Sequence, residues 1–274
     1  MPRRFVTLPW LAALLALVLL WALAALWLAG RYGPAGVILA AAAALFILLV
    51  LALEAVLRLV DLSRRDVSDQ RQLHELLSLH ATLRPEMPLP VMREYAISPG
   101  LGVWYLRLLL AAAPKTVVEL GSGASTLIAA LALRRVGGGK VIALDHEPKY
   151  AEETRGWLEE HGVAEWAEVR VAPLKPMELA GRTFRWYDRE AIADLESIDV
   201  LLIDGPPSPE ERTRRLPGLE LLGPRITPGG VILVDDTHRK VWREAVLRWA
   251  EKQGFEVESS PAGVKAYLVL RRPA

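Results

Sequence analysis

Glycine and acidic residues recur at the ends of short apolar runs, and these are the residues that could do chemistry. The run VVEL (117–120) leads directly into GSGAST (121–126). Gly121 and Gly123 allow the chain to turn sharply into a helix and to bring bare backbone against a ligand. The N-terminus of that helix offers free N–H groups, as in pyrophosphate sites. An ordinary strand-to-helix turn is the alternative interpretation.

The side chains around this turn favour a different ligand from a pyrophosphate. A dinucleotide-binding GxGxxG pattern would place its third glycine at position 126, which is Thr126. Glu119 would repel a diphosphate and attract an ammonium group. Asp145 ends the next apolar run, VIALD (141–145), where it could accept hydrogen bonds from both hydroxyls of a ribose. An amino-acid end and a ribose end together predict S-adenosylmethionine.

Two stretches resemble a known enzyme class. VVELGSGAST (117–126) is similar to the first motif of class I S-adenosylmethionine-dependent methyltransferases, and VIALDHEPKYAEET (141–154) to the second. The resemblance extends over about residues 97–272, and the DGPP and VDD motifs resemble a bacterial group for which no substrate is implied. It implies a Rossmann-like sheet of seven strands, mostly parallel, that ends in an antiparallel hairpin. Ser125 departs from the many members that have a third glycine.

The turn and the resemblance together assign a set of cofactor-binding residues near the ends of the first four strands. The set is Glu119, Gly121, Ser122, Gly123, Ser125, Thr126, Asp145, His146, Ala172, Pro173 and Asp204.

Three aspartates form a candidate metal site. Asp204 ends one predicted strand in LLIDGPP, and Asp235 and Asp236 end the next in VILVDD. Neighbouring strand ends lie about 5 Å apart, and carboxylate oxygens suit a hard cation such as Mg²⁺. The arrangement is similar to that of catechol-type O-methyltransferases, although Pro207 stands where those enzymes carry a lysine. A turn at Asp204 and helix capping by Asp235 or Asp236 are the alternatives.

The expected reaction is a direct displacement at the methyl carbon, which needs an aligned nucleophile and the loss of its proton. We expect Asp204 and Asp235 to take part, with a metal lowering the pKa of the hydroxyl or with His238 as the base. A solvated loop histidine is the alternative for His238.

Two further groups of side chains are ambiguous. Trp186 and Tyr187 could stack on adenine or on a substrate ring, or they could plug a long loop. Arg212, Arg214 and Arg215 could face an anionic group of a substrate, although a solvated helix face explains such a run more often.

Strands and helices alternate in the body of the chain, residues 91–274. The spacing predicts strands at 116–120, 141–145, 167–174, 198–205 and 229–236, helices at 125–135, 148–162 and 240–254, and a closing hairpin around 261–263. This alternation is typical of an α/β fold with a mostly parallel sheet. Ligands bind such sheets beyond the carboxyl ends of the strands, where the polar residues lie.

Two uncharged runs precede the body. Residues 5–29 and 34–53 are each long enough to cross a bilayer, and GRYGP (30–34) joins them as a turn. We therefore expect a transmembrane hairpin over 1–60, with helices at about 5–29 and 34–59. A buried helical hairpin in a soluble oligomer is the alternative. A charged connecting helix and a proline-rich linker would follow over 61–90.

Arginines flank the hairpin on its outer sides, and the short turn holds only Arg31. The positive-inside rule then predicts a two-pass protein of the inner (cytoplasmic) membrane with the body facing the cytoplasm.

Composition excludes several classes of site and partner. The 274 residues contain no cysteine, so disulfides, thiolate metal sites and cysteine nucleophiles are absent. Because residues 1–60 hold four arginines and one glutamate, the remainder has 29 basic and 31 acidic residues, a net charge of −2. A body this balanced does not suggest a nucleic-acid partner.

These patterns predict a membrane-anchored, S-adenosylmethionine-dependent methyltransferase. The expected acceptor is a hydroxyl on a glycan, a lipid-linked sugar or another small polar molecule, and Mg²⁺ could assist. The hairpin could instead serve only for location or for homo-oligomerisation. The alternative function is a non-catalytic, membrane-tethered module that binds S-adenosylmethionine or a nucleotide. Glu119 and Thr126 disfavour a nicotinamide-dependent enzyme.

Overall fold

The computed structural model describes residues 8–92, 96–207, 213–259 and 266–274. The chain divides into two units, Met1–Val67 and Ser68–Ala274. The unit boundary lies within a helix, ahead of the proline-rich segment at which the sequence suggested a domain boundary.

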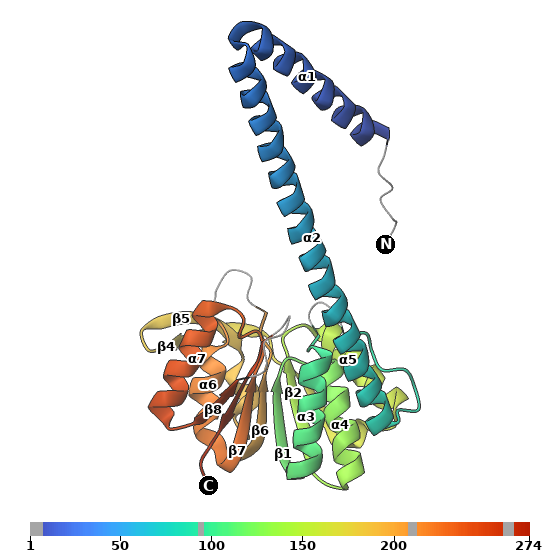
Figure 1. The fold of residues 1–274 in the computed structure, drawn as a ribbon. Helices are drawn as coiled ribbons and strands as arrows, with labels where there is room; N and C mark the ends of the chain where they lie inside the picture. Colours follow the sequence, from blue (N-terminus) through green and yellow to red (C-terminus); the bar gives the residue numbers. More distant parts are fainter. Residues whose placement is uncertain (1–7, 93–95, 208–212, 260–265) are drawn as a thin grey trace. The chain divides into compact units, whose positions relative to one another are not determined.

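The first unit contains α1 (Leu8–Tyr32) and the first part of α2 (Pro34–Leu83), which meet at Gly33 with a φ of 56° (Figure 1). The sequence predicted a helix to about residue 59 and then a separate connecting helix, and this division is wrong because α2 continues unbroken for 50 residues. The chain has neither glycine nor proline between Val37 and Leu83, so nothing interrupts the backbone where the apolar pattern ends.

The helix α2 has the length and apolar character needed to cross a membrane, with a mean hydropathy of 3.0 over its most apolar stretch. Large apolar side chains such as Ile38, Phe46 and Leu57 are exposed along it. The expected hairpin of two membrane helices remains a prediction.

The second unit is built on a seven-stranded sheet in the order β3-β2-β1-β6-β7-β9-β8. The strands β1 (Thr116–Leu120), β2 (Lys140–Asp145), β3 (Ala167–Val171), β6 (Ile198–Ile203) and β7 (Ile226–Val234) are parallel. The last two, β8 (Glu256–Ser259) and β9 (Leu268–Arg271), form the antiparallel hairpin. The predicted α/β sheet with a C-terminal hairpin is therefore confirmed.

Helices cover both faces of this sheet (Figure 1). One face packs against α3 (Pro99–Ala112), α4 (Ala124–Val136) and α5 (Pro148–Glu160), and the last turns of α2 join that core through Leu79 and Leu83. The other face packs against α6 (Leu216–Leu222) and α7 (Lys240–Gln253). Alternate residues of the central strands enter the two cores, as expected for strands buried on both faces.

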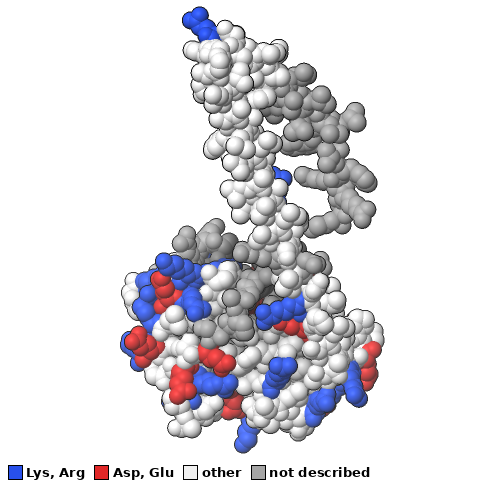
Figure 2. All heavy atoms as spheres, in the orientation of Figure 1, with Lys and Arg blue, Asp and Glu red and all other residues white. Residues whose placement is uncertain are grey.

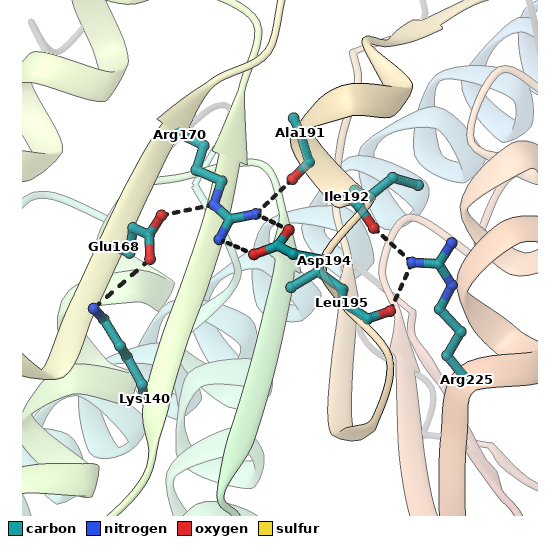
Figure 3. A network of polar contacts seen from close by, with 8 residues as sticks. All are labelled: Lys140, Glu168, Arg170, Ala191, Ile192, Asp194, Leu195 and Arg225. Atoms are coloured by element: carbon teal, nitrogen blue, oxygen red, sulfur yellow. Dashed lines mark hydrogen bonds and ion pairs between the residues drawn. The ribbon is translucent and has the colours of Figure 1, made fainter.

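A second, two-stranded sheet, β4 (Leu174–Leu179) with β5 (Arg182–Tyr187), follows β3, where the sequence predicted a loop. A polar network fastens the chain after β5 (Figure 3). Arg170 of β3 donates to the Ala191 carbonyl at 2.8 Å and forms a two-bond pair with Asp194. Arg225 donates to the carbonyls of Ile192 and Leu195, both at 2.6 Å. The network holds the segment 191–195 between β3 and the 3₁₀ helix η3 (Gly223–Arg225).

Acidic and basic side chains are interspersed on the face of the second unit seen in Figure 2. The sequence prediction that nucleic acid is not a partner stays a prediction.

Candidate functional site

The turn between β1 and α4 has the open backbone that its glycines predict. Gly121 and Gly123 have φ values of 108° and 147°, which side-chain-bearing residues rarely adopt. Gly121 also lies against the end of β6, because a Cβ placed on it would be 3.5 Å from the Gly205 nitrogen. The Leu120 carbonyl accepts from the Asp204 N–H at 3.1 Å and from the Gly205 N–H. The turn and the end of β6 thus form one continuous backbone surface.

Glu119 lies beneath this turn and is completely buried. Its carboxylate accepts from Tyr105 Oη at 2.8 Å, Ser125 Oγ at 3.0 Å and Thr126 Oγ1 at 2.6 Å. Burial raises the pKa of Glu119 to about 7, although the three hydrogen bonds from hydroxyl groups lower it. The negative charge of Asp204 also raises this pKa. The carboxylate of Glu119 is thus bonded to three hydroxyls of the protein, and the expected attraction between Glu119 and a ligand ammonium stays a prediction.

Thr126 explains the departure from the dinucleotide pattern. Its Oγ1 donates to Glu119 and accepts from the Gly123 N–H at 3.1 Å, so it links the buried carboxylate to the first turn of α4. A glycine at this position would leave both groups without that bond. Ser125 and Thr126 therefore connect the buried carboxylate of Glu119 to the start of α4, and Thr126 also bonds to the turn at Gly123.

Asp145 ends β2 beside the turn. Its Oδ2 accepts from the Ser122 N–H at 3.2 Å and from Ser122 Oγ at 2.7 Å, and its Oδ1 accepts from the Glu147 N–H at 3.0 Å. Burial works against the charge, yet His146 and the bonds from Glu147 and Ser122 hold the pKa of Asp145 below its usual value. Asp145 is thus an ionised acceptor at the edge of the turn, as a ribose-binding carboxylate needs to be.

The neighbouring cofactor candidates occupy the same edge of the sheet. His146 lies 3.5 Å from Asp145, measured from Nδ1 to Oδ1. Ala172 is buried and donates its N–H to the Asp145 carbonyl at 2.7 Å, and the Pro173 carbonyl accepts from the Asp188 N–H.

The three aspartates do not assemble into a metal site. The described residues contain no group of three acidic or histidine side chains that could hold a metal ion. Asp235 is completely buried, whereas Asp204 and Asp236 share the guanidinium of Arg215. The residues present do not fit Mg²⁺, because the guanidinium of Arg215 already lies between the carboxylates of Asp204 and Asp236. The predicted Mg²⁺ ligation by Asp204, Asp235 and Asp236 is corrected on this ground.

His238, the predicted base, is an exposed side chain whose Nδ1 lies 3.9 Å from Asp236 Oδ1. Asp236 has a φ of 59°, and its Oδ2 also lies 3.3 Å from Arg239 Nη2. Capping of α7 by Asp235 or Asp236 does not occur, since Arg239 is the N-cap residue and makes no side-chain cap bond.

Trp186 and Tyr187 belong to β5 and are buried in the core beneath α6 and α7. Trp186 therefore plugs the core instead of offering an open stacking face. The Tyr187 hydroxyl reaches the end of β6, since a Cβ on Gly205 would lie 2.2 Å from Tyr187 Oη.

Two functional residues were missed or undervalued at the sequence level. Tyr105 lies on the apolar helix α3. The one sequence signal was its hydroxyl group, because a hydroxyl buried among apolar residues needs a hydrogen-bond acceptor. Arg215 was assigned more readily to a solvated face, yet it is 8% exposed. Arg215 is the N-cap residue of α6, and its guanidinium lies against Asp204 and Asp236. Arg212 lies outside the described residues.

The chain is similar to known proteins in sequence pattern and in fold. Residues 118–237 match a family described as a methyltransferase domain. An O-methyltransferase from Bacillus cereus in complex with SAH shares the fold, with 20% identity, a TM-score of 0.51 and coverage of 77% of this chain and 97% of that chain. The cofactor-bound protein Rv0187 from MTB has 21% identity, a TM-score of 0.50 and coverage of 74% and 89%.

Among curated proteins, no relative of this chain was found. The chain is therefore similar to a methyltransferase domain over residues 118–237, and it shares its fold with the Bacillus cereus protein.

Proposed function

We propose that this protein transfers a methyl group from S-adenosylmethionine to a hydroxyl oxygen of a polar acceptor at a membrane surface. The acceptor class is a glycan, a lipid-linked sugar or another small polar molecule. The methyltransferase-domain match over residues 118–237 supports the reaction class. The apolar, exposed surface of α2 supports the location.

The observation that carries the proposal is the pairing of Asp145 with the glycine turn. An ionised carboxylate held by Ser122 borders a bare backbone bend at the N-terminus of α4. This edge offers an acceptor for ribose hydroxyls, and the positive end of the α4 helix dipole favours a carboxylate tail. A diphosphate is disfavoured there, because Glu119 and Asp145 both lie against the bend.

The donor supplies an activated methyl group on a sulfonium. The chain's own residues must then hold the acceptor oxygen and receive its proton. His238 is our candidate base, since it is exposed beside Asp236 at the end of β7. Asp204 follows β6, and its N–H donates to the Leu120 carbonyl at the start of the turn, so we infer that it orients groups near the methyl.

The membrane location follows from the sequence of the first unit. We infer that α1 and α2 form a two-pass anchor in the cytoplasmic membrane, with the second unit on the cytoplasmic side, because arginines flank both outer ends. An anchor of this kind would concentrate the enzyme near membrane-bound acceptors.

Radiolabelled S-adenosylmethionine incubated with the full chain and fractionated membrane extracts tests the proposal. We expect label in a lipid-linked or glycan fraction, and we expect Asp145→Asn to reduce it strongly at a concentration of donor that does not saturate the variant. If S-adenosylhomocysteine binds but no fraction takes up label, the alternative function of a non-catalytic binding module gains support. If neither binding nor labelling occurs, the proposed function is wrong.

A further inference from the structure

Arg215 lies at the junction of two parallel strands. Its Nη2 is 3.4 Å from Asp204 Oδ1, after β6, and 3.2 Å from Asp236 Oδ2, after β7. Its Nε donates to the Pro206 carbonyl at 3.4 Å. One guanidinium therefore bridges the carboxylates that the sequence assigned to a metal ion.

A divalent cation does not fit beside this guanidinium. Mg²⁺ requires several oxygen ligands at about 2.0–2.1 Å in a near-octahedral arrangement. Here Asp204 and Asp236 both face a positive group, and Arg239 adds a second one next to Asp236. An incoming cation would meet like charge and would have to expel a buried side chain.

Two buried groups near Asp204 and Asp236 can each donate a further hydrogen bond. Within the part of the chain that the structure describes, Arg215 Nη1 and Tyr187 Oη are buried and have no hydrogen-bond partner. Buried donors without partners are costly, so such a pair indicates that a further oxygen belongs at the site. Burial raises the pKa of Tyr187. The charges of Asp145 and Asp204 raise this pKa further and the charge of Arg215 lowers it, so Tyr187 belongs to the same group of interacting residues.

We propose that Arg215 occupies the position of the divalent cation of metal-dependent O-methyltransferases, so that Nη1 holds the acceptor oxygen and the reaction needs no metal. This inference rests on the proposed function. The acceptor oxygen forms a bond to the methyl carbon while the carbon–sulfur bond breaks and its electron pair stays on sulfur. The hydroxyl proton passes to His238. Asp204 and Asp236 act as positioning residues that fix the guanidinium.

Manganese binding tests the assignment without knowledge of the acceptor. The free Mn²⁺ signal in electron paramagnetic resonance is measured while the full chain is titrated in detergent. We expect no binding at this site in the wild type. Arg215→Met removes the guanidinium that Asp204 and Asp236 share and leaves Arg239 beside Asp236, so Mn²⁺ affinity should rise at least tenfold. Adding Asp204→Asn should reverse the gain.

Arg214→Met is the matched control, since it removes the same charge from the neighbouring position and should gain no Mn²⁺ affinity. Wild-type protein that binds Mn²⁺ as tightly as Arg215→Met would overturn the inference. So would folded Arg215→Met that shows no gain.

A chelator assay keeps the test decisive if Arg215→Met does not fold. Methyl transfer to the membrane extracts should be unchanged in EDTA, and loss of transfer that Mg²⁺ restores would contradict the inference. Failure of the proposed function itself would appear separately, as wild-type protein that does not bind S-adenosylhomocysteine.

Discussion

Asp145 and Glu119 end adjacent strands, yet their surroundings push their pKa values in opposite directions. Bonds from Ser122 and Glu147, together with His146, keep Asp145 ionised, whereas burial raises the pKa of Glu119 to about 7. Asp145 can therefore accept hydrogen bonds from a ligand over the physiological range. The charge on Glu119 changes within that range, so its effect on the cofactor depends on pH.

Replacing Asp145 should weaken the cofactor site specifically. Asp145→Asn removes the charge that would accept from ribose hydroxyls, and we expect a 10- to 100-fold loss of affinity for S-adenosylhomocysteine, or about 1–3 kcal/mol. Isothermal titration calorimetry measures this. Glu152→Gln is the matched control, because it makes the same charge change on an exposed side chain of α5. Equal affinities in the two variants would refute a cofactor role for Asp145.

Cofactor affinity should also depend on the protonation of Glu119. Because the carboxyl group takes up a proton below about pH 7, affinity for the ammonium-bearing ligand should fall as the pH drops through that value. Tyr105→Phe removes a bond that stabilises the ionised form, so the midpoint should move to higher pH. Calorimetry from pH 5.5 to 8.5 gives both midpoints. The affinity of Glu119→Gln should not change with pH. If the affinity of the wild-type protein is equally independent of pH, the ionised Glu119 carboxylate does not contribute to cofactor binding.

At the scale of elements, the close approach of β5 to the end of β6 shapes the site. Gly205 permits this approach, since a Cβ there would lie 2.2 Å from Tyr187 Oη and 2.9 Å from the Leu120 carbonyl oxygen. The polar network around Arg170 and Arg225 fastens the chain that follows β5. Together these contacts keep the Tyr187 hydroxyl beside the turn.

Gly205→Ala should therefore destabilise the second unit. Overpacking against a backbone oxygen and a buried hydroxyl should cost about 1–3 kcal/mol and lower the melting temperature by several degrees. Gly156→Ala is the control, because a Cβ at that helical position of α5 meets nothing within 4 Å. Thermal unfolding followed by circular dichroism compares the two. If Gly205→Ala and Gly156→Ala have the same melting temperature, Gly205 is not packed tightly against Tyr187 and Leu120.

The sequence was informative for elements with strong local patterns. The strand TVVEL coincides with β1, and the helix after it begins at Ala124, one residue before its predicted start. It failed where tertiary contacts decide the structure. The β4–β5 hairpin lies in a stretch with mixed polarity, and the seven-residue helix α6 was not predicted.

The site was predictable in part for the same reason. Asp145, Gly121 and Gly123 carry local signals, and they border the turn as expected. The environment of Arg215 depends on strands β6 and β7 meeting, which local spacing does not encode. Three aspartates at strand ends therefore predicted a metal, although an arginine 11 residues after Asp204 lies between two of them.

At the scale of the whole molecule, the chain consists of two units with different surfaces. In the first, the long apolar part of α2 is exposed, and the second has cores on both faces of its sheet. Exposed apolar surface of that extent favours a lipid environment. The second unit contains every candidate site residue.

Removing residues 1–67 should separate location from binding. The full chain should sediment with membranes and resist extraction by high salt, whereas a chain that begins at Ser68 should remain in the supernatant. Immunoblots of the fractions measure this. S-adenosylhomocysteine affinity of the shorter chain should stay within about threefold. Membrane retention of the shorter chain after a salt wash would contradict the assignment of the anchor to the first unit.

The most direct test of the central claim is a crystal structure of the second unit with S-adenosylhomocysteine. We predict that the ribose hydroxyls bond to Asp145 and that the amino-acid tail lies along the turn at Gly121 and Gly123. A ligand bound elsewhere, with this turn vacant, would contradict the account.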